Sequence, residues 1–148
     1  MKQTTTRRLY PPFPDELWAR IEHADRLTVY MLHPEPRPCA GRPAFHGYPV
    51  LGRVEVDESS IARVVGVLRK GLYGRSSPKR CWIPHHGVRA SDGPKSVDLV
   101  MCFMCEVMQH FAGPRAKKFV WGQVGKAPKP VLNRLLRKAG VLHGPAPA

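Results

Sequence analysis

The chain has 148 residues, and 43% of them are hydrophobic, which is enough for the core of one compact domain and more than a disordered chain contains. No apolar run approaches the roughly 18 to 20 residues of a membrane helix, and the polar first residues lack the apolar segment of a signal peptide. We therefore expect a cytoplasmic protein without a membrane-spanning segment.

The formal net charge of +13 is concentrated in the second half of the chain. Residues 75–148 contain 13 Lys and Arg against 3 acids, whereas residues 1–74 contain 11 against 8. A field of this sign attracts polyanions such as nucleic acid, anionic lipid or an acidic protein, and the attraction weakens with salt. The alternative is a basic composition that serves solubility alone.

In the first half, proline content and apolar spacing indicate the elements. They are an extended basic arm over 1–13, a helix over 15–24, a strand over 27–32, a proline-rich loop over 33–47 and a strand over 48–56. The main helix follows the N-cap Asp57. Its apolar stripe, which should pack on a sheet, consists of Ile61, Val64, Val65, Leu68 and Leu72.

The second half is predicted to begin with a β-hairpin. Turn residues at 92–95 connect an extended segment at 88–90 with a return strand over 97–111, nearly all apolar as in a central strand. Asp98 lies in this strand, and we expect a salt bridge to Arg89 across the hairpin, or a bond that orients a histidine. The remaining elements are a strand over 118–124, a helix from Pro130 to Lys138 and a tail at 143–148.

The order of these elements does not alternate as βαβ units do. It predicts a single α+β domain over residues 14–142, with a mostly antiparallel sheet and about three helices packed on it.

Cys81, His86, Cys102 and Cys105 follow the pattern C-x4-H-x15-C-x2-C. Two ligand pairs separated by a hairpin are typical of zinc ribbons, and thiolate and imidazole ligands suit zinc. We therefore expect these four residues to lie in one neighbourhood and to be candidate zinc ligands.

Three alternatives remain for the cysteines, which also include Cys39. In a continuous strand, Cys102 and Cys105 would point to opposite faces and could not share a metal ion. They would then be buried, inert thiols. They would otherwise form a redox pair, or Cys81 would act as a nucleophile with His86 as base, joined by His46 or Cys39. With no signal peptide, reduced cysteines are expected.

Cations are interleaved with aromatic residues at 79–82 and 117–121, as on surfaces that bind single-stranded nucleic acid. The candidate contacts are Lys79, Arg80, Arg115, Lys117, Lys118, Lys126 and Lys129. The same pattern also fits a strand whose Phe119 and Trp121 share one face and fill the core, and we favour this interpretation over a binding surface.

Three segments resemble a family of short, uncharacterised bacterial proteins: Phe45 to Gly52, Cys81 to Val88, and Val97 to Cys105. In that family, a C-F-x-P-R-H-G-[LV]-R segment precedes D-[LF]-V-I-C-F-E-C. The chain departs from the pattern at Trp82, His85 and Met104, where the family has Phe, Arg and Glu. The resemblance covers about residues 26–142, implies no activity, and favours a joint site for the cysteines and His86.

Together these features predict a binding module for nucleic acid or another polyanion, with a Cys/His cluster that holds zinc. The alternatives are a thiol- or metal-dependent enzyme or redox protein, and an accessory protein that acts through contacts with a protein partner.

Overall fold

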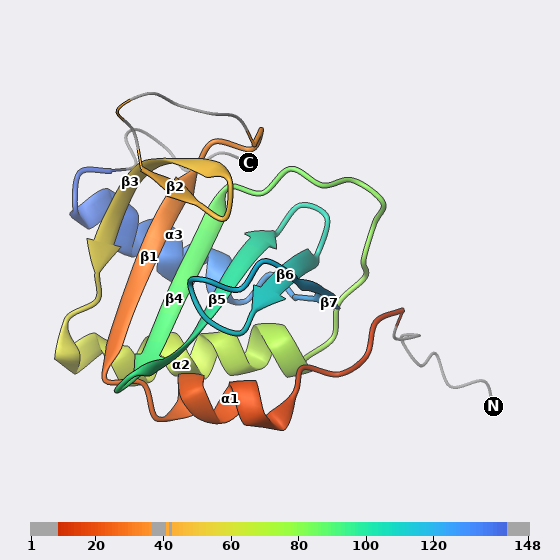
Figure 1. Cartoon of the computed structure of the whole chain (residues 1–148), viewed down its shortest axis with the longest axis horizontal. Coiled ribbons are helices and arrows are strands. Elements are labelled where there is room, and N and C mark those ends of the chain that lie inside the picture. The colour runs from red at the N-terminus through yellow and green to blue at the C-terminus, as the bar shows by residue number, and fades with distance from the viewer. Residues whose placement is uncertain (1–8, 37–40, 42, 142–148) are drawn as a thin grey trace.

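The computed structural model describes residues 9–36, 41 and 43–141. In this part of the chain, three helices pack on one face of a seven-stranded antiparallel sheet (Figure 1). The helices are α1 (Asp15–Glu22), α2 (Glu58–Tyr73) and α3 (Pro128–Lys138). The strands are β1 (Arg26–Leu32), β2 (Ala44–Phe45), β3 (Tyr48–Glu55), β4 (His86–Asp92), β5 (Lys95–Cys102), β6 (Val107–Phe111) and β7 (Val120–Gln123), in the spatial order β2-β3-β1-β4-β5-β6-β7. The predicted single-domain α+β class is confirmed.

The main core lies between the helices and the sheet face that they cover, which we call the helical face. α2 buries Val64, Leu68 and Leu72 of its predicted stripe, while Ile61 and Val65 are half-buried at its margin. Strand residues that point to the helical face include Leu27, Val29, Val88, Ala90, Leu99, Met101 and Met108. From the proline-rich segment before α1, Phe13 also joins this core. None of the described helices combines the length and the apolar character that a bilayer crossing requires.

The predicted return strand over 97–111 is wrong in one respect, because it is two strands. β5 ends at Cys102, a turn follows over 103–106, and β6 runs back antiparallel from Val107. Glu106 adopts a φ of +55° in this turn. The chain offers no Gly, Pro or Asn here to mark a reversal, so the sequence pattern contained no turn signal. The turn separates the two cysteines of the C-x2-C pair.

The opposite side of the sheet, which we call the open face, carries no helix. The hairpin β2–β3 folds over part of it, so that Tyr30, Phe45, Tyr48, Val100 and Phe111 form a second, smaller apolar cluster. The connection from β6 to β7 crosses in front of this face (Figure 1). β7 is an edge strand, paired on one side only.

Candidate functional site

Three sulfur atoms gather where β5 ends. The sulfurs of Cys81, Cys102 and Cys105 all lie within 4.8 Å of one another. Cys81 and Cys105 are joined by a disulfide, and Cys102 is a buried free thiol. The backbone N–H of Cys105 donates to Cys102 Sγ over 3.3 Å, which holds the turn against the third sulfur. We call these three residues the cysteine cluster.

The cysteine cluster permits two chemical states. With the disulfide reduced, three thiolates at this spacing suit a soft metal ion, whose bonds to sulfur are near 2.3 Å. With the disulfide formed, Cys81 and Cys105 have no thiolate to donate, so the two states exclude each other. The expectation of reduced cysteines is therefore wrong for Cys81 and Cys105, whereas Cys102 is the free thiol that was expected. The bond links Cys81 to Cys105 rather than closing the C-x2-C pair.

His86 does not belong to the cysteine cluster, contrary to the four-residue site predicted from spacing. In the β4–β5 register His86 lies opposite Met101, so it shares the helical face with Met101. Cys102 is the next residue of β5 and points to the other face, because side chains alternate along a strand. The alternation of the hairpin thus separates the imidazole from the sulfurs. Cys39 lies outside the described residues.

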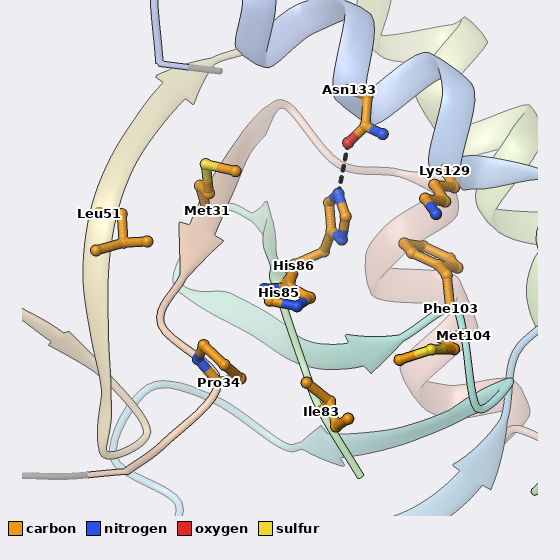
Figure 2. Close-up of a pocket in the computed structure, with 10 residues that line it drawn as sticks. All are labelled: Met31, Pro34, Leu51, Ile83, His85, His86, Phe103, Met104, Lys129 and Asn133. Carbon is orange, nitrogen blue, oxygen red and sulfur yellow. Dashed lines mark hydrogen bonds between the residues drawn. The ribbon is translucent and has the colours of Figure 1, made fainter. Parts of the chain in front are cut away.

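The imidazole of His86 is held by a residue that sequence analysis did not single out. His86 Nε2 donates to Asn133 Oδ1 in α3 over 2.7 Å, as the dashed line in Figure 2 marks. Burial lowers the pKa of His86 to about 4, so the ring is neutral at physiological pH. In the sequence, Asn133 could have been noticed only as a polar amide next to the apolar Leu132, on the side of α3 that is buried.

Asp98 forms the predicted salt bridge to Arg89 and also binds a histidine, His46, which the sequence had not identified as its partner. Arg89 donates to Asp98 through Nε and Nη2, each over 2.8 Å, and His46 Nε2 donates over 2.7 Å. Burial alone would raise the pKa of Asp98, but the bonds from Arg89 and His46 outweigh it and lower the pKa. The same carboxylate raises the pKa of Arg89. His46 stacks on Phe111 at 3.6 Å between ring centroids, so this group fixes the β2–β3 hairpin on the open face.

Aromatic rings form a row across the open face toward β7. Trp82 contacts Trp121 at 4.9 Å between centroids, Trp121 contacts Phe119 at 5.2 Å, and Phe119 contacts Phe111 at 5.8 Å. Phe119 and Trp121 do share one face, but they remain 41% and 37% exposed, so the prediction that they fill the core is wrong. The physical reason is that they lie at the sheet edge, on the face without helices.

Cations flank this row on both sides. Lys79 and Arg80 line a hollow of about 320 Å³ together with Trp82 and Trp121. Lys117 lines a second hollow, of about 390 Å³, together with Phe119. Arg115 and Lys118 are exposed in the same β6–β7 connection. We call Trp82, Phe119 and Trp121, the cations Lys79, Arg80 and Lys117 that line these hollows, and the exposed neighbour Lys118 the aromatic–basic strip.

The other two predicted contacts lie elsewhere. Lys126 follows Gly125, whose backbone N–H is bonded to Gly71 of α2, so Lys126 lies on the helical side of the sheet. Lys129, in the first turn of α3, lines a different pocket with His86 and Asn133. The structure therefore separates the seven predicted cations into two sets. Only one of these sets accompanies the exposed rings.

Comparisons with known protein families, curated proteins and solved structures found no match. The function is therefore inferred from the residues and their geometry.

Proposed function

We propose that the protein binds single-stranded nucleic acid along the aromatic–basic strip. The observation that carries this proposal is that Phe119 and Trp121 are large, solvent-exposed rings in contact with each other, with cations on both sides. Exposed aromatic side chains offer their faces to unstacked bases, and each stacked base contributes roughly 1 to 3 kcal/mol. Lysine and arginine beside the rings neutralise the phosphates that connect those bases.

The electrostatics of the open face favour a polyanion. Of the three acids in residues 75–148, Asp98 is fully buried and bonded to Arg89 and His46. No acidic side chain lines either hollow of the strip among the described residues. The cations of the strip therefore face solvent without an opposing carboxylate in these hollows, which strengthens the local positive potential.

The ligand should be single-stranded and bound with little preference for sequence. Bases of a duplex are already stacked on each other, whereas the bases of a single strand are free to stack on Trp121 and Phe119. The strip contains no arrangement of side chains that matches a known base-reading motif. Affinity should therefore fall steeply with salt, as phosphate contacts release counterions.

A titration of labelled single-stranded and duplex oligonucleotides tests this proposal. The variant K117E/K118E reverses two charges on the strip, and the matched control K126E/K138E reverses two exposed charges on the helical side. We expect the first variant to weaken binding at near-physiological salt by at least about tenfold more than the control. Equal losses in the two variants would show that only net charge matters, and the strip would then be wrongly assigned.

A second candidate function rests on the cysteine cluster. We propose that its reduced form binds zinc through Cys81, Cys102 and Cys105, because their sulfurs already lie within 4.8 Å of one another. The three thiolates would fill three of the four positions around a tetrahedral zinc, and the ion would tie the segment before β4 to the β5–β6 turn. Elemental analysis of protein purified under reducing conditions should give one zinc per chain. C102S should lose it, while oxidised protein should contain none; zinc-free reduced protein would contradict this proposal.

The same sulfurs are where a thiol-dependent or redox activity would reside. Cys102 is fully buried, which restricts its access to reagents in the folded protein. A protein partner for the exposed rings is the remaining alternative. It would replace the nucleic-acid proposal if oligonucleotides fail to bind even at low salt.

A further inference from the structure

A pocket on the helical side of the sheet shares no lining residue with the aromatic–basic strip or the cysteine cluster, although Phe103 and Met104 of its wall lie in the turn between Cys102 and Cys105. Its volume is about 350 Å³, within the range of small-molecule sites. Figure 2 shows the side chains that line the pocket. They come from β1 together with Pro34 just after it, from β3, from the segment entering β4, from the β5–β6 turn and from α3. Five segments that are distant in sequence thus converge on one space.

The walls of this pocket are mainly apolar and partly open to solvent. Leu51, Ile83 and Met104 line it while remaining 46%, 38% and 52% exposed. Met31 and Phe103 supply further apolar lining. Three of the large apolar side chains that the protein leaves exposed are therefore gathered around one hollow, which favours an apolar body inside it.

The pocket has few polar groups, and its only charge is positive. Lys129 is the one lining residue that is charged at neutral pH, since burial lowers the pKa values of both His85 and His86. No acidic residue lines the pocket, and Lys129 forms no ion pair within the described part of the chain. His86 is oriented by Asn133, and because its Nε2 donates, its Nδ1 is an acceptor.

We propose that this pocket binds a small amphipathic carboxylate, with its apolar body among Met31, Ile83 and Phe103 and its anionic group at Lys129. A single ammonium group matches a single negative charge, whereas a phosphate dianion would need more donors than the lining offers. A volume of about 350 Å³ fits on the order of a dozen heavy atoms, since one water occupies about 30 Å³. The pocket lies on the helical side, so this inference does not depend on nucleic-acid binding.

Octanoate, octanol and octylamine are matched probes, because they share one chain and differ in charge. Methyl-labelled methionine allows their binding to be observed by NMR: Met31 and Met104 line the pocket, and buried Met108 lies outside its lining. We expect octanoate to shift the Met31 and Met104 methyl signals saturably while Met108 stays in place. Octanol should bind more weakly, and octylamine should not bind.

Two variants test the assignment of the groups. K129Q should weaken octanoate binding about tenfold, the effect of losing one charge-assisted hydrogen bond, while the exposed control K126Q should not. L51W should fill the pocket and abolish the shifts, and K117E/K118E should leave them unchanged. The proposal would be overturned by the absence of saturable shifts. It would also be overturned if octylamine bound as tightly as octanoate, or if K129Q and K126Q were indistinguishable.

Discussion

His86 at the start of β4 and Asn133 in α3 are joined by a buried hydrogen bond of 2.7 Å, across 47 residues of sequence. The bond attaches the helix to the sheet at the site where spacing alone had indicated a zinc ligand. A charged imidazole would be costly at this position, because burial strongly disfavours its protonated form.

The stability of the protein should therefore fall between about pH 6.5 and pH 4. In this window an unfolded His86 takes up a proton, whereas the folded residue, with a pKa of about 4, does not. The unfolded state binds more protons, so the free energy of unfolding decreases as pH falls, by up to about 3 kcal/mol from this residue. Denaturant melts at pH 7, 5.5 and 4.5 measure this loss.

His85 and His110 also have pKa values lowered by burial, so the decisive comparison is between variants. H86Q should show a shallower loss of stability with falling pH than the wild type. The control H23Q changes an exposed histidine of the segment after α1 and should retain the wild-type slope. An unchanged slope in H86Q would show that His86 is not buried in its neutral form.

The ion pair of Asp98 should contribute far more than an exposed pair of the same type. Asp98 is fully buried between Arg89 and His46, whereas Arg26 and Glu55 form a solvent-exposed cross-strand pair at 3.2 Å. D98N leaves the donors of Arg89 and His46 without a charged acceptor, so it should lower the free energy of unfolding by about 2 to 4 kcal/mol. This figure already allows for the partial exposure of Arg89 to solvent. E55Q should cost less than about 1 kcal/mol. Similar losses in chemical denaturation would contradict this assignment.

Leu68 tests the packing of α2. Its side chain is fully buried against the sheet, so L68A should lower the free energy of unfolding by about 2 to 5 kcal/mol. Arg63 is exposed on the same helix, and R63A should change it by less than about 0.5 kcal/mol. A loss below about 0.5 kcal/mol in L68A would mean that the stripe is not part of the core.

The cysteine cluster predicts a specific pattern of linkage in oxidised protein. Peptide mapping without reduction should find Cys81 linked to Cys105, with Cys102 alkylated only after unfolding. The disulfide joins residues 24 positions apart in the sequence, and closing a loop of that length restricts the unfolded chain. Reduction should therefore lower the free energy of unfolding by about 3 kcal/mol in the absence of metal. A Cys102–Cys105 link would contradict the arrangement of the turn.

Local patterns in the sequence were sufficient to predict much of the fold. The apolar stripe around Leu68 identified α2, and turn residues at 92–95 identified the β4–β5 hairpin. These features depend on neighbours within one helix face or one turn, where periodicity and turn chemistry are decisive. The pairing of Asp98 with Arg89 followed from the same hairpin, since the register places them opposite each other.

The parts of the site that were not predicted depend on tertiary relationships. The reversal after Cys102 requires a left-handed Glu106, a residue that gives no turn signal in the sequence. The separation of His86 from the sulfurs follows from the β4–β5 register, which fixes the face of each residue. The exposure of Phe119 and Trp121 depends on β7 being the last strand of the sheet. Strand periodicity shows which residues share a face of the sheet, but it does not show whether another element covers that face.

Oligonucleotide affinity of the double variant F119L/W121L tests the nucleic-acid proposal most directly. Leucine keeps the strip apolar and its charge unchanged but removes the two exposed rings, together with their contacts to Trp82 and Phe111. We expect single-strand binding to weaken by about tenfold or more at near-physiological salt, at roughly 1 to 3 kcal/mol per stacked base, with little change in weak duplex binding. The control L51A changes an exposed apolar residue on β3 and should bind as the wild type does. Single-strand affinity that is unchanged in F119L/W121L, measured by fluorescence anisotropy, would contradict binding along the aromatic–basic strip.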